Sequence, residues 1–490
     1  MSRRILARPR ARHLVAGLVL AGCLVPIASA SGAGTITCLQ RMTGGTWSTY
    51  GQSLSGQQHQ RAERVIGVGN VAGLAEAWRS DTTVVQSAPP IIAGGCVFLN
   101  TNSAIEAREL RTGRLVWRSH GIDTGGTFAP TVVDGRVHLA IVKDGAARAV
   151  ALDQRTGRQL WMSKPIWFGY PTGQQSSAIV YDGIQLVFTT GPDNDPQAKQ
   201  GYALVDARTG RILHASLTLP KSDRDKGLVG GGVWGTPTVD TRTGYAYVGT
   251  SNPESKRGES RYDDSIIKLD LNRDHRTFGR IVATYKGTPD SVTGYDNPVC
   301  QTVGGDAYVN TGTYGGSPTC GQIDVDFGVG PTLWRNSKGR LMGAATQKSG
   351  VLHVFYGDTM KGAWSKQLFV TMSFLGGNIA RIATDGRTLY VVANPGVLYA
   401  FDAETGATRW QVPLVSPIPM EGGDVVLANG ILYFVGDGQA HAYDARDGSV
   451  LWDSPVIPGA SIGSAGALAG HYYVANHYGT VVAYRLPGQH

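Results

Sequence analysis

The chain has 490 residues, including 67 glycines and 10 tryptophans, a composition that suits many short strands joined by tight turns. Its formal net charge of +8 does not indicate nucleic-acid binding, because five arginines lie in the first 30 residues, which contain no acid. The rest carries 40 basic and 37 acidic side chains and has no basic stripe of the kind that nucleic-acid binding needs. Nucleic acid is therefore not an expected partner.

Residues 1–30 have the pattern of an export signal, with an arginine-rich start and an apolar run from Leu14. Ala28-Ser-Ala30 is a cleavage site for secretion, whereas Leu20-Ala-Gly-Cys23 resembles a lipoprotein box in which Cys23 would carry the lipid. Both routes stay open, so we expect an extracytoplasmic protein that is either secreted or a cell-surface lipoprotein. No later apolar run is long enough to span a bilayer.

Residues 31–73 form a polar N-terminal extension with little periodicity. From residue 74 to residue 488 a short frame recurs, in which an acid, two residues, Thr-Gly and three residues precede a tryptophan. Copies of this frame, some of them variants, are Glu109–Trp117, Asp153–Trp161, Asp206–His214, Asp402–Trp410 and Asp444–Trp452. The acid can bond backbone amides of the turn, and the glycine accepts a positive φ. A unit repeated at roughly 40–50 residues is typical of propeller blades.

Counting the aromatic side chain that begins each predicted outer strand gives eight blades. These positions are Trp78, Trp117, Trp161, His214, Tyr285, Trp364, Trp410 and Trp452. The sequence therefore predicts an all-β, eight-bladed β-propeller. The strand at Trp78 lacks preceding strands, and the strands near residues 471–475 and 480–484 lack an outer one. We expect these to complete one blade from both ends and to close the ring, which removes exposed sheet edges.

The spacing widens in the middle of the chain. It is 71 residues from His214 to Tyr285 and 79 from there to Trp364. Insertions in blade repeats usually enter loops on one face, often the binding face. The longest insertion covers about residues 287–324. We therefore expect the functional site under the long loops of the third to fifth blades.

Four cysteines follow the export signal, an even number for an oxidising compartment, which allows two disulfides and three connectivities. Closeness in sequence favours Cys300–Cys320 within the long insertion. Cys38–Cys96 would then hold the N-terminal segment to the first blade. No Cys-x-x-Cys pair is present, which excludes a zinc ribbon and a c-type haem site.

The polar residues that could carry chemistry stand near predicted strand ends, and no hydrolase, zinc or phosphate motif accompanies them. They are Thr190, Asp193, Trp234, Asn252, Asp326 and Lys348. With Trp47-Ser-Thr-Tyr-Gly51 near the start, they make residues 45–485 resemble the quinoprotein alcohol dehydrogenases. Within that family the chain is similar to the polyvinyl-alcohol-dehydrogenase-type members. The resemblance implies pyrroloquinoline quinone (PQQ) and Ca²⁺ in the central channel.

The resemblance also implies a role for each residue. Trp234 would stack on the quinone, Thr190 and Lys348 would contact it, Asp193, Asn252 and Asp326 would bind Ca²⁺, and Asp326 would also be the general base. Asp193 replaces the glutamate of the family, and Lys348 replaces its usual arginine. The adjacent cysteine pair of many members is absent, but carboxylate and amide oxygens are ligands that Ca²⁺ prefers.

The implied function is an exported oxidoreductase that acts on alcohol groups, including polymeric or secondary alcohols, and passes electrons to a separate acceptor. Non-catalytic propellers such as outer-membrane assembly lipoproteins share the same repeats. The alternative is therefore a scaffold or binding propeller that has lost the cofactor. The two hypotheses differ in whether Asp193, Asn252 and Asp326 meet at one mouth of the channel, with Trp234 below.

Overall fold

The computed structural model describes most of the chain from residue 36 to residue 488. It leaves out residues 43, 81–87, 102, 123–128, 167–175, 192–199, 254–257, 289–312, 315–316, 319–324, 369–379, 394–395, 415–423, 437, 458–461, 469 and 477–479. Within the described part, the helices are η1 (Val71–Gly73) and α1 (Lys221–Arg224), and all other elements are strands. None of these helices is long and apolar enough to cross a membrane.

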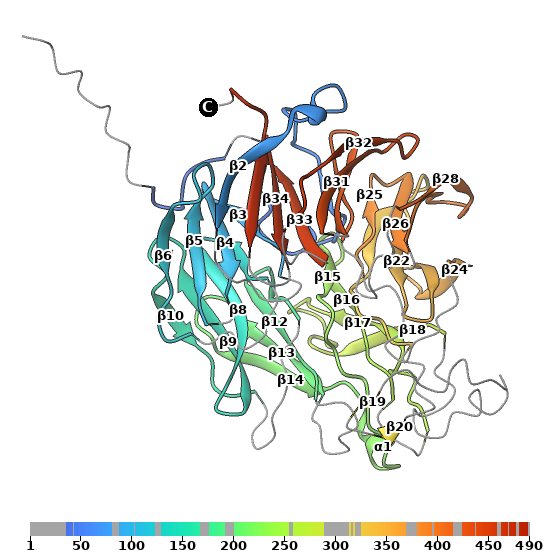
Figure 1. The fold of residues 1–490 in the computed structure, drawn as a ribbon. Helices are drawn as coiled ribbons and strands as arrows, with labels where there is room; N and C mark the ends of the chain where they lie inside the picture. The colour runs from blue at the N-terminus through green and yellow to red at the C-terminus, as the bar shows by residue number, and fades with distance from the viewer. Residues whose placement is uncertain are drawn as a thin grey trace, which may run out of the picture. The chain divides into compact units, whose positions relative to one another are not determined.

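Four-stranded antiparallel sheets follow one another along the first half of the chain (Figure 1). The first sheet contains β3 (Ile91–Ala93), β4 (Cys96–Asn100), β5 (Ile105–Glu109) and β6 (Leu115–Arg118). The second contains β7 (Thr131–Val133), β8 (Arg136–Lys143), β9 (Ala146–Asp153) and β10 (Gln159–Met162). The third contains β11 (Ile179–Tyr181), β12 (Ile184–Thr189), β13 (Gly201–Asp206) and β14 (Ile212–Leu217). The fourth contains β15 (Thr238–Asp240), β16 (Tyr245–Gly249), β17 (Ser265–Asp270) and β18 (Ile281–Lys286).

The second half continues the series after a short hairpin of β19 (Thr313–Tyr314) and β20 (Ser317–Pro318). The fifth sheet contains β21 (Thr332–Arg335), β22 (Leu341–Thr346), β23 (Val351–Tyr356) and β24 (Lys361–Gln367). The sixth contains β25 (Ala383–Thr384), β26 (Thr388–Ala393), β27 (Val397–Asp402) and β28 (Thr408–Pro413). The seventh contains β29 (Val426–Ala428), β30 (Ile431–Gly436), β31 (Gln439–Asp444) and β32 (Val450–Asp453).

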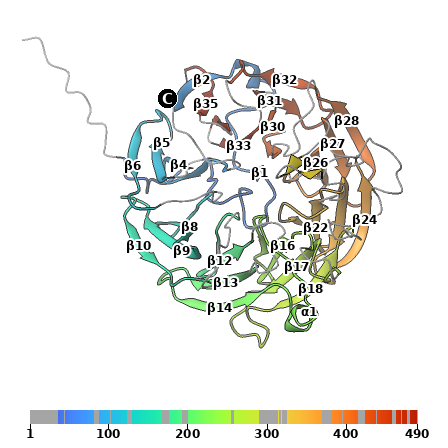
Figure 2. The ribbon, with the colours of Figure 1, turned by 60° about the horizontal axis from the view of Figure 1, so that its bottom comes forward.

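Strands from both ends of the chain make up the last sheet. Its strands are β33 (Ile462–Leu468), β34 (His471–Asn476), β35 (Val481–Arg485) and β2 (Ala75–Ser80). Because β30 also pairs with β33, this blade and the seventh are joined, with β1, into one nine-stranded sheet. β2 pairs antiparallel with β35, and Ala75 lies opposite Arg485. The sheets are arranged around a central axis, with the last strand of each on the outside of the ring (Figure 2). The prediction of an eight-bladed propeller is confirmed, and each of the eight aromatic side chains counted in the sequence lies on an outer strand.

The recurring frame couples six of the blades to the blade before them. In its turn, Asp402 Oδ1 accepts a hydrogen bond from the Thr405 amide at 2.9 Å, and Gly406 has a φ of +73°. A Cβ on Gly406 would lie 2.8 Å from Cε3 of Trp364, the tryptophan of the preceding blade. The same contact recurs between Gly113 and Trp78, Gly157 and Trp117, Gly210 and Trp161, Gly279 and His214, and Gly448 and Trp410. The glycine thus makes room for a neighbouring ring.

The N-terminal segment comprises the described residues before β2. Its residues 47–60 run along the inner strands of six blades, and its strand β1 (His59–Gln60) lies near the centre of the ring (Figure 2). Its carbonyl oxygens accept backbone hydrogen bonds from Ile92, Val132, Val239, Leu333, Thr384 and Leu427. β1 also pairs parallel with β29. This segment therefore lies against the inner strands and ties most of the blades together. The sequence boundary at residue 74 stays a prediction.

The predicted disulfide between Cys38 and Cys96 is present and joins the N-terminal segment to β4 of the first blade. Both sulfur-bearing residues are fully buried. The other predicted pair, Cys300 and Cys320, lies outside the described residues. The export signal at residues 1–30, with Cys23, also lies outside them.

Candidate functional site

The candidate site residues lie at one end of their sheets. Thr190 follows β12, Asn252 follows β16, and Lys348 lies between β22 and β23. Trp234 precedes β15, and Asp326 precedes β21. Successive connections of an antiparallel sheet lie at alternate ends, so the loops after second strands and those before first strands share one face of the ring. The residues predicted from the sequence therefore come from three neighbouring blades and lie on the same face of the ring.

Trp234, Asp326 and Lys348 are in direct contact. Trp234 Nε1 donates a hydrogen bond to Asp326 Oδ2 at 2.7 Å, and Lys348 Nζ lies 3.0 Å from Asp326 Oδ1. The Lys348 ammonium group also lies over the indole ring, 4.7 Å from its centre. The side chain of Asp326 is 3% exposed and that of Lys348 is 12% exposed, so this ion pair is largely withdrawn from water. The group thus combines the aromatic face of Trp234, the cation of Lys348 and the carboxylate of Asp326.

Asn252 and Thr190 lie close to this group without a direct bond to it among the described contacts. The Phe327 amide donates to the Thr250 carbonyl at 3.2 Å, which places Asp326 beside the end of β16 and near Asn252. A Cβ on Gly232 would lie 2.8 Å from Thr190 Oγ1. Thr190 therefore packs on the stretch that leads to Trp234.

A hydrogen-bonded group behind Lys348 holds its turn in place. The backbone amide of Lys348 donates to the Asp326 carbonyl at 3.1 Å. Gln347 bonds the end of the preceding blade twice, accepting from the Thr288 amide at 2.9 Å and donating to the Thr288 carbonyl at 2.8 Å. His353 Nε2 lies 2.9 Å from Gln347 Oε1, and Tyr285 Oη lies 3.0 Å from His353 Nδ1.

The protonation state of His353 follows from these partners. An amide oxygen only accepts hydrogen bonds, so Nε2 carries the proton and Nδ1 accepts from the Tyr285 hydroxyl. Burial lowers the pKa of His353 to about 4, which keeps the imidazole neutral at pH 7. The sequence motif contained Gln347 but gave no sign of this role, because Thr288 and His353 become its neighbours only on folding.

Arg381 and Asp424 form a second buried group, which sequence reasoning missed. The Arg381 amide donates to Asp424 Oδ1 at 2.9 Å, and Arg381 Nη2 donates to the Thr236 carbonyl at 2.6 Å. The guanidinium lies over the ring of Tyr50 from the N-terminal segment. Both charged residues stand just before the first strand of a blade, as Trp234 and Asp326 do, and this shared position is the signal that could have revealed them.

The residues present suit a planar anionic quinone and a hard cation. Asp326 offers a buried carboxylate that two different donors already face, and Asn252 offers the amide oxygen that Ca²⁺ accepts. Within the described residues, no three His, Cys, Asp or Glu side chains gather closely enough to hold a metal ion. The predicted ligand Asp193 lies outside the described residues, so the full ligand set stays a prediction.

The fold and its repeats define the class of protein, an eight-bladed propeller like that of the quinoprotein alcohol dehydrogenases. The chain belongs to the family whose model, described as outer membrane protein assembly factor BamB, matches residues 61–289 and 322–489. The predicted resemblance to quinoprotein alcohol dehydrogenases is confirmed by its relatives and by structures of the same fold.

Two polyvinylalcohol dehydrogenases are among these relatives. That of Sphingopyxis sp. (strain 113P3) is 27% identical over 410 residues, which cover 74% of this chain and 58% of the relative. That of Pseudomonas sp. is 23% identical over 418 residues, which cover 78% of this chain and 61% of the relative. The match thus spans about three-fifths of the length of these relatives.

Solved structures share the fold at lower identity. The quinohemoprotein alcohol dehydrogenase from Comamonas testosteroni aligns with a TM-score of 0.71 and 17% identity, covering 93% of this chain and 84% of that one. A europium-containing methanol dehydrogenase aligns with a TM-score of 0.72 and 15% identity, covering 92% of this chain and 100% of that one. These likenesses bear on the fold alone.

Proposed function

We propose that the chain is a quinone-dependent oxidoreductase acting on alcohol groups, with PQQ and Ca²⁺ as its cofactors. The observation that carries this proposal is the contact of Trp234, Asp326 and Lys348 at one face of the ring. These three residues come from two connections between blades and one hairpin, and nothing in propeller architecture alone requires them to meet. The dehydrogenase names of the relatives support the same class of reaction.

Each residue has a place in holding the cofactors. Trp234 would stack on the quinone ring, and Lys348 and Thr190 would contact its polar atoms. Asn252 and Asp326, together with Asp193, would supply oxygen ligands for Ca²⁺. When bound, PQQ supplies the electron acceptor, and Ca²⁺ supplies a Lewis acid.

The chain's own side chains would manage the proton and the charge. Asp326 is the carboxylate that would accept the hydroxyl proton of the alcohol. The hydrogen bond from Trp234 Nε1 fixes the orientation of that carboxylate, and the charge of Lys348 balances it. Gln347 would keep Lys348 in position through its two bonds to Thr288. Burial of the group would exclude water, which strengthens its electrostatic interactions.

We place this activity outside the cytoplasm, in a secreted protein or a cell-surface lipoprotein. The Cys38–Cys96 disulfide supports this location, because such bonds persist in oxidising compartments. An alcohol would be the substrate, and a separate electron acceptor would reoxidise the enzyme. Polymeric or secondary alcohols are the first substrates to screen, since the relatives include polyvinylalcohol dehydrogenases.

The test is calorimetric titration of PQQ into the calcium-loaded protein. We expect a Kd of about 1 μM or tighter. Asp326→Ala should weaken binding at least about tenfold, because it removes a charged ligand of the Ca²⁺ that accompanies PQQ. Asp182→Asn, on the exposed β11–β12 turn at the opposite end of its sheet from Thr190, is the matched control and should bind PQQ as the native protein does. Calcium removal should weaken binding in the native protein.

A protein that binds PQQ would then be assayed with alcohols and an artificial electron acceptor. Absence of heat and of any thermal shift would contradict the proposal. Equal binding by the native protein and Asp326→Ala would also contradict it. Either result would favour a non-catalytic propeller that serves as a scaffold or binding module, and a search for its protein or glycan partner would follow.

A further inference from the structure

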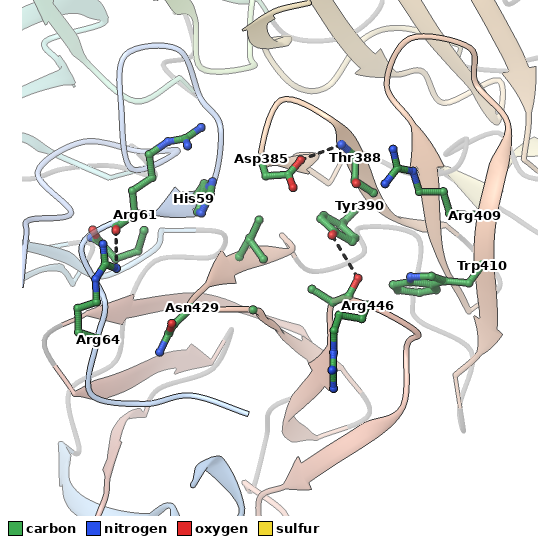
Figure 3. Close-up of a pocket in the computed structure, with 14 residues that line it drawn as sticks. His59, Arg61, Arg64, Asp385, Thr388, Tyr390, Arg409, Trp410, Asn429 and Arg446 are labelled. Carbon is green, nitrogen blue, oxygen red and sulfur yellow. Dashed lines mark hydrogen bonds between the residues drawn. The ribbon is translucent and has the colours of Figure 1, made fainter. Parts of the chain in front are cut away.

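A cavity of about 440 Å³ lies between the sixth and seventh blades (Figure 3). Its walls include Asp385 on the β25–β26 turn, Asn429 on the β29–β30 turn and Arg446 on the β31–β32 turn. These turns lie at the opposite end of their sheets from loops such as the one that carries Lys348. The cavity therefore opens on the face of the ring away from the candidate redox site, and nothing in the proposed function uses it.

Four arginines line this cavity. Arg61 and Arg64 come from the N-terminal segment and lie on one side, while Arg409 comes from β28 and lies on the other (Figure 3). Arg446 is the fourth. The one acidic residue in the lining is Asp385. Among the described lining residues, positive charge is thus in clear excess.

Two of the arginines already have acidic partners. Arg409 Nη2 lies 2.9 Å from Asp402 Oδ2, and Arg446 Nη2 lies 2.6 Å from Asp444 Oδ2. Asp402 and Asp444 do not line the cavity, and each offsets the charge of one arginine that does. The excess charge of the cavity comes from the other pair.

Arg61 and Arg64 bond to neutral oxygens in the described part of the chain. Arg61 Nη2 donates to Gln57 Oε1 at 3.2 Å. Arg64 Nη1 donates to the carbonyl of Arg61 at 2.7 Å and to that of Glu63 at 2.5 Å. Neither guanidinium has an ion pair there, so both retain a full charge and further donors for a ligand.

The loop that carries these two arginines is held by a buried carboxylate. Glu63 Oε1 accepts hydrogen bonds from the amides of Arg64, Val65 and Ile66 at 2.6 to 3.1 Å. Glu63 Oε2 accepts from the Gly470 amide at 2.9 Å. These hydrogen bonds engage both oxygens of the Glu63 carboxylate and hold the loop in place. A loop that is already ordered loses little backbone entropy when it binds a ligand.

Asp385 offsets one of the two remaining positive charges, and the lining keeps a net positive charge. Asp385 Oδ1 is taken up by its own turn, where it accepts from the amides of Arg387 and Thr388 at 2.8 Å. Burial, and then the charge of Arg61, lowers the pKa of His59 to about 4, so its imidazole is neutral at pH 7. Tyr390 and Trp410 add aromatic wall.

We propose that this cavity binds a small oxyanion with two or more negative charges, of the polycarboxylate or phosphate class. The planar fork of a guanidinium matches both groups with paired hydrogen bonds. The volume is in the range of ordinary small-molecule sites. The ligand would join the N-terminal segment to two blades, because Arg61 and Arg64 belong to the segment and Arg409 and Arg446 to the blades.

The experiment is calorimetric titration of citrate and, separately, of pyrophosphate into the purified protein at low salt. We expect at least one of them to bind with a Kd below about 1 mM. Arg61→Gln/Arg64→Gln should raise that Kd at least about tenfold, because two charged donors are lost. Added NaCl should also weaken binding, since these side chains are partly in water. Citrate and pyrophosphate separate the carboxylate source from the phosphate source.

Arg208→Gln is the matched control, because Arg208 has the same turn position in the third blade as Arg446 in the seventh. It should leave the Kd within about twofold of the native value. Lys348→Ala should also leave the Kd unchanged, which separates this site from the proposed redox site. Should the double variant fail to fold, Arg446→Gln replaces it and should raise the Kd about threefold or more. Absence of binding by both anions, or an equal loss in Arg208→Gln, would overturn the proposal.

Discussion

Asp263 is a buried carboxyl group beside the candidate site, with its side chain fully withdrawn from solvent. Asp263 Oδ2 accepts a hydrogen bond from the Ser260 amide at 2.7 Å. Burial raises the pKa of Asp263 to about 7, although the Ser260 amide and the charge of Lys286 oppose the shift. The free acid therefore suits the folded protein better than the carboxylate does.

This shift predicts how stability depends on pH. The pKa is raised from 3.8 in the unfolded chain to about 7 in the folded one. The stabilising contribution is thus complete below pH 4 and is lost as the pH rises through 7. Asp263→Asn keeps the acceptor for Ser260 and cannot ionise. At pH 8 it should unfold at a Tm up to about 4 °C above the native Tm, and at pH 4 the two should coincide.

Thermal denaturation at pH 4, 6 and 8 checks this expectation. Asp182→Asn removes an exposed carboxyl group from a turn and should show no such trend. A Tm difference for Asp263→Asn that is the same at every pH would mean that packing, and not ionisation, sets the effect.

At the scale of single residues, the sequence predicts best where chemistry and motif coincide. Trp234, Asp326 and Lys348 stand in separate motifs, and the structure brings them into contact. The role of Gln347 could not be predicted, because its bonds to Thr288 cross 59 positions of sequence. A hydrogen bond formed only after folding leaves no local pattern.

At the scale of the blade, the repeated glycine and the repeated tryptophan have one physical cause. Gly157 has a φ of +71°, and a Cβ there would lie 2.4 Å from Cε3 of Trp117. Gly135 has the same φ of +71° but has no atom within 4 Å of a Cβ. A comparison of the two glycines therefore distinguishes the cost of backbone strain from the cost of a collision with the Trp117 ring.

Gly157→Ala and Gly135→Ala should differ in stability for this reason. Both should lose about 1 kcal/mol because alanine is strained at positive φ. Gly157→Ala should lose about 1–3 kcal/mol more, because the indole ring must move. Denaturant or thermal unfolding of the two variants measures the difference. Equal losses would show that the ring moves without cost and that the frame reflects turn geometry alone.

The blades were predictable from sequence because each is a local unit. An acid, a glycine and an aromatic side chain within nine residues mark a turn and an outer strand, and five of the eight outer strands follow such a frame. The same regularity links neighbouring blades, since the tryptophans at positions 78, 117, 161, 364 and 410 each lie against the glycine of the next frame.

At the scale of the whole molecule, the N-terminal segment was the part that the sequence could not place. Its backbone bonds reach six blades, from Ile92 to Leu427. Such a segment has neither helix nor strand periodicity of its own, because its residues form hydrogen bonds with different blades. Its polar composition predicted an extension, whereas residues 47–60 lie along the inner strands.

The buried pair of Arg381 and Asp424 connects this segment to the ring. Arg381 is 1% exposed, and its Nη1 lies 2.5 Å from the position of a Cβ on Gly56. Gln58 Nε2 donates to Asp424 Oδ2 at 2.9 Å. Burial raises the pKa of Asp424, and the charge of Arg381 opposes that shift. Segment and blades thus share one buried electrostatic unit.

Removing one member of this unit should therefore cost more than removing both. Arg381→Met leaves a buried carboxylate without its cation, which should lower the free energy of unfolding by about 3–5 kcal/mol. For a chain of this size that corresponds to a Tm lower by about 1 °C per kcal/mol. In Arg381→Met/Asp424→Asn no charge remains buried, and Gln58 Oε1, which has no partner in the described contacts, can accept from the new amide. The double variant should recover at least about half of the loss. Asp424→Asn alone completes the comparison. If the Tm losses of Arg381→Met and Asp424→Asn simply added in the double variant, the pair would not act as a unit, and the segment would be held by its backbone bonds alone.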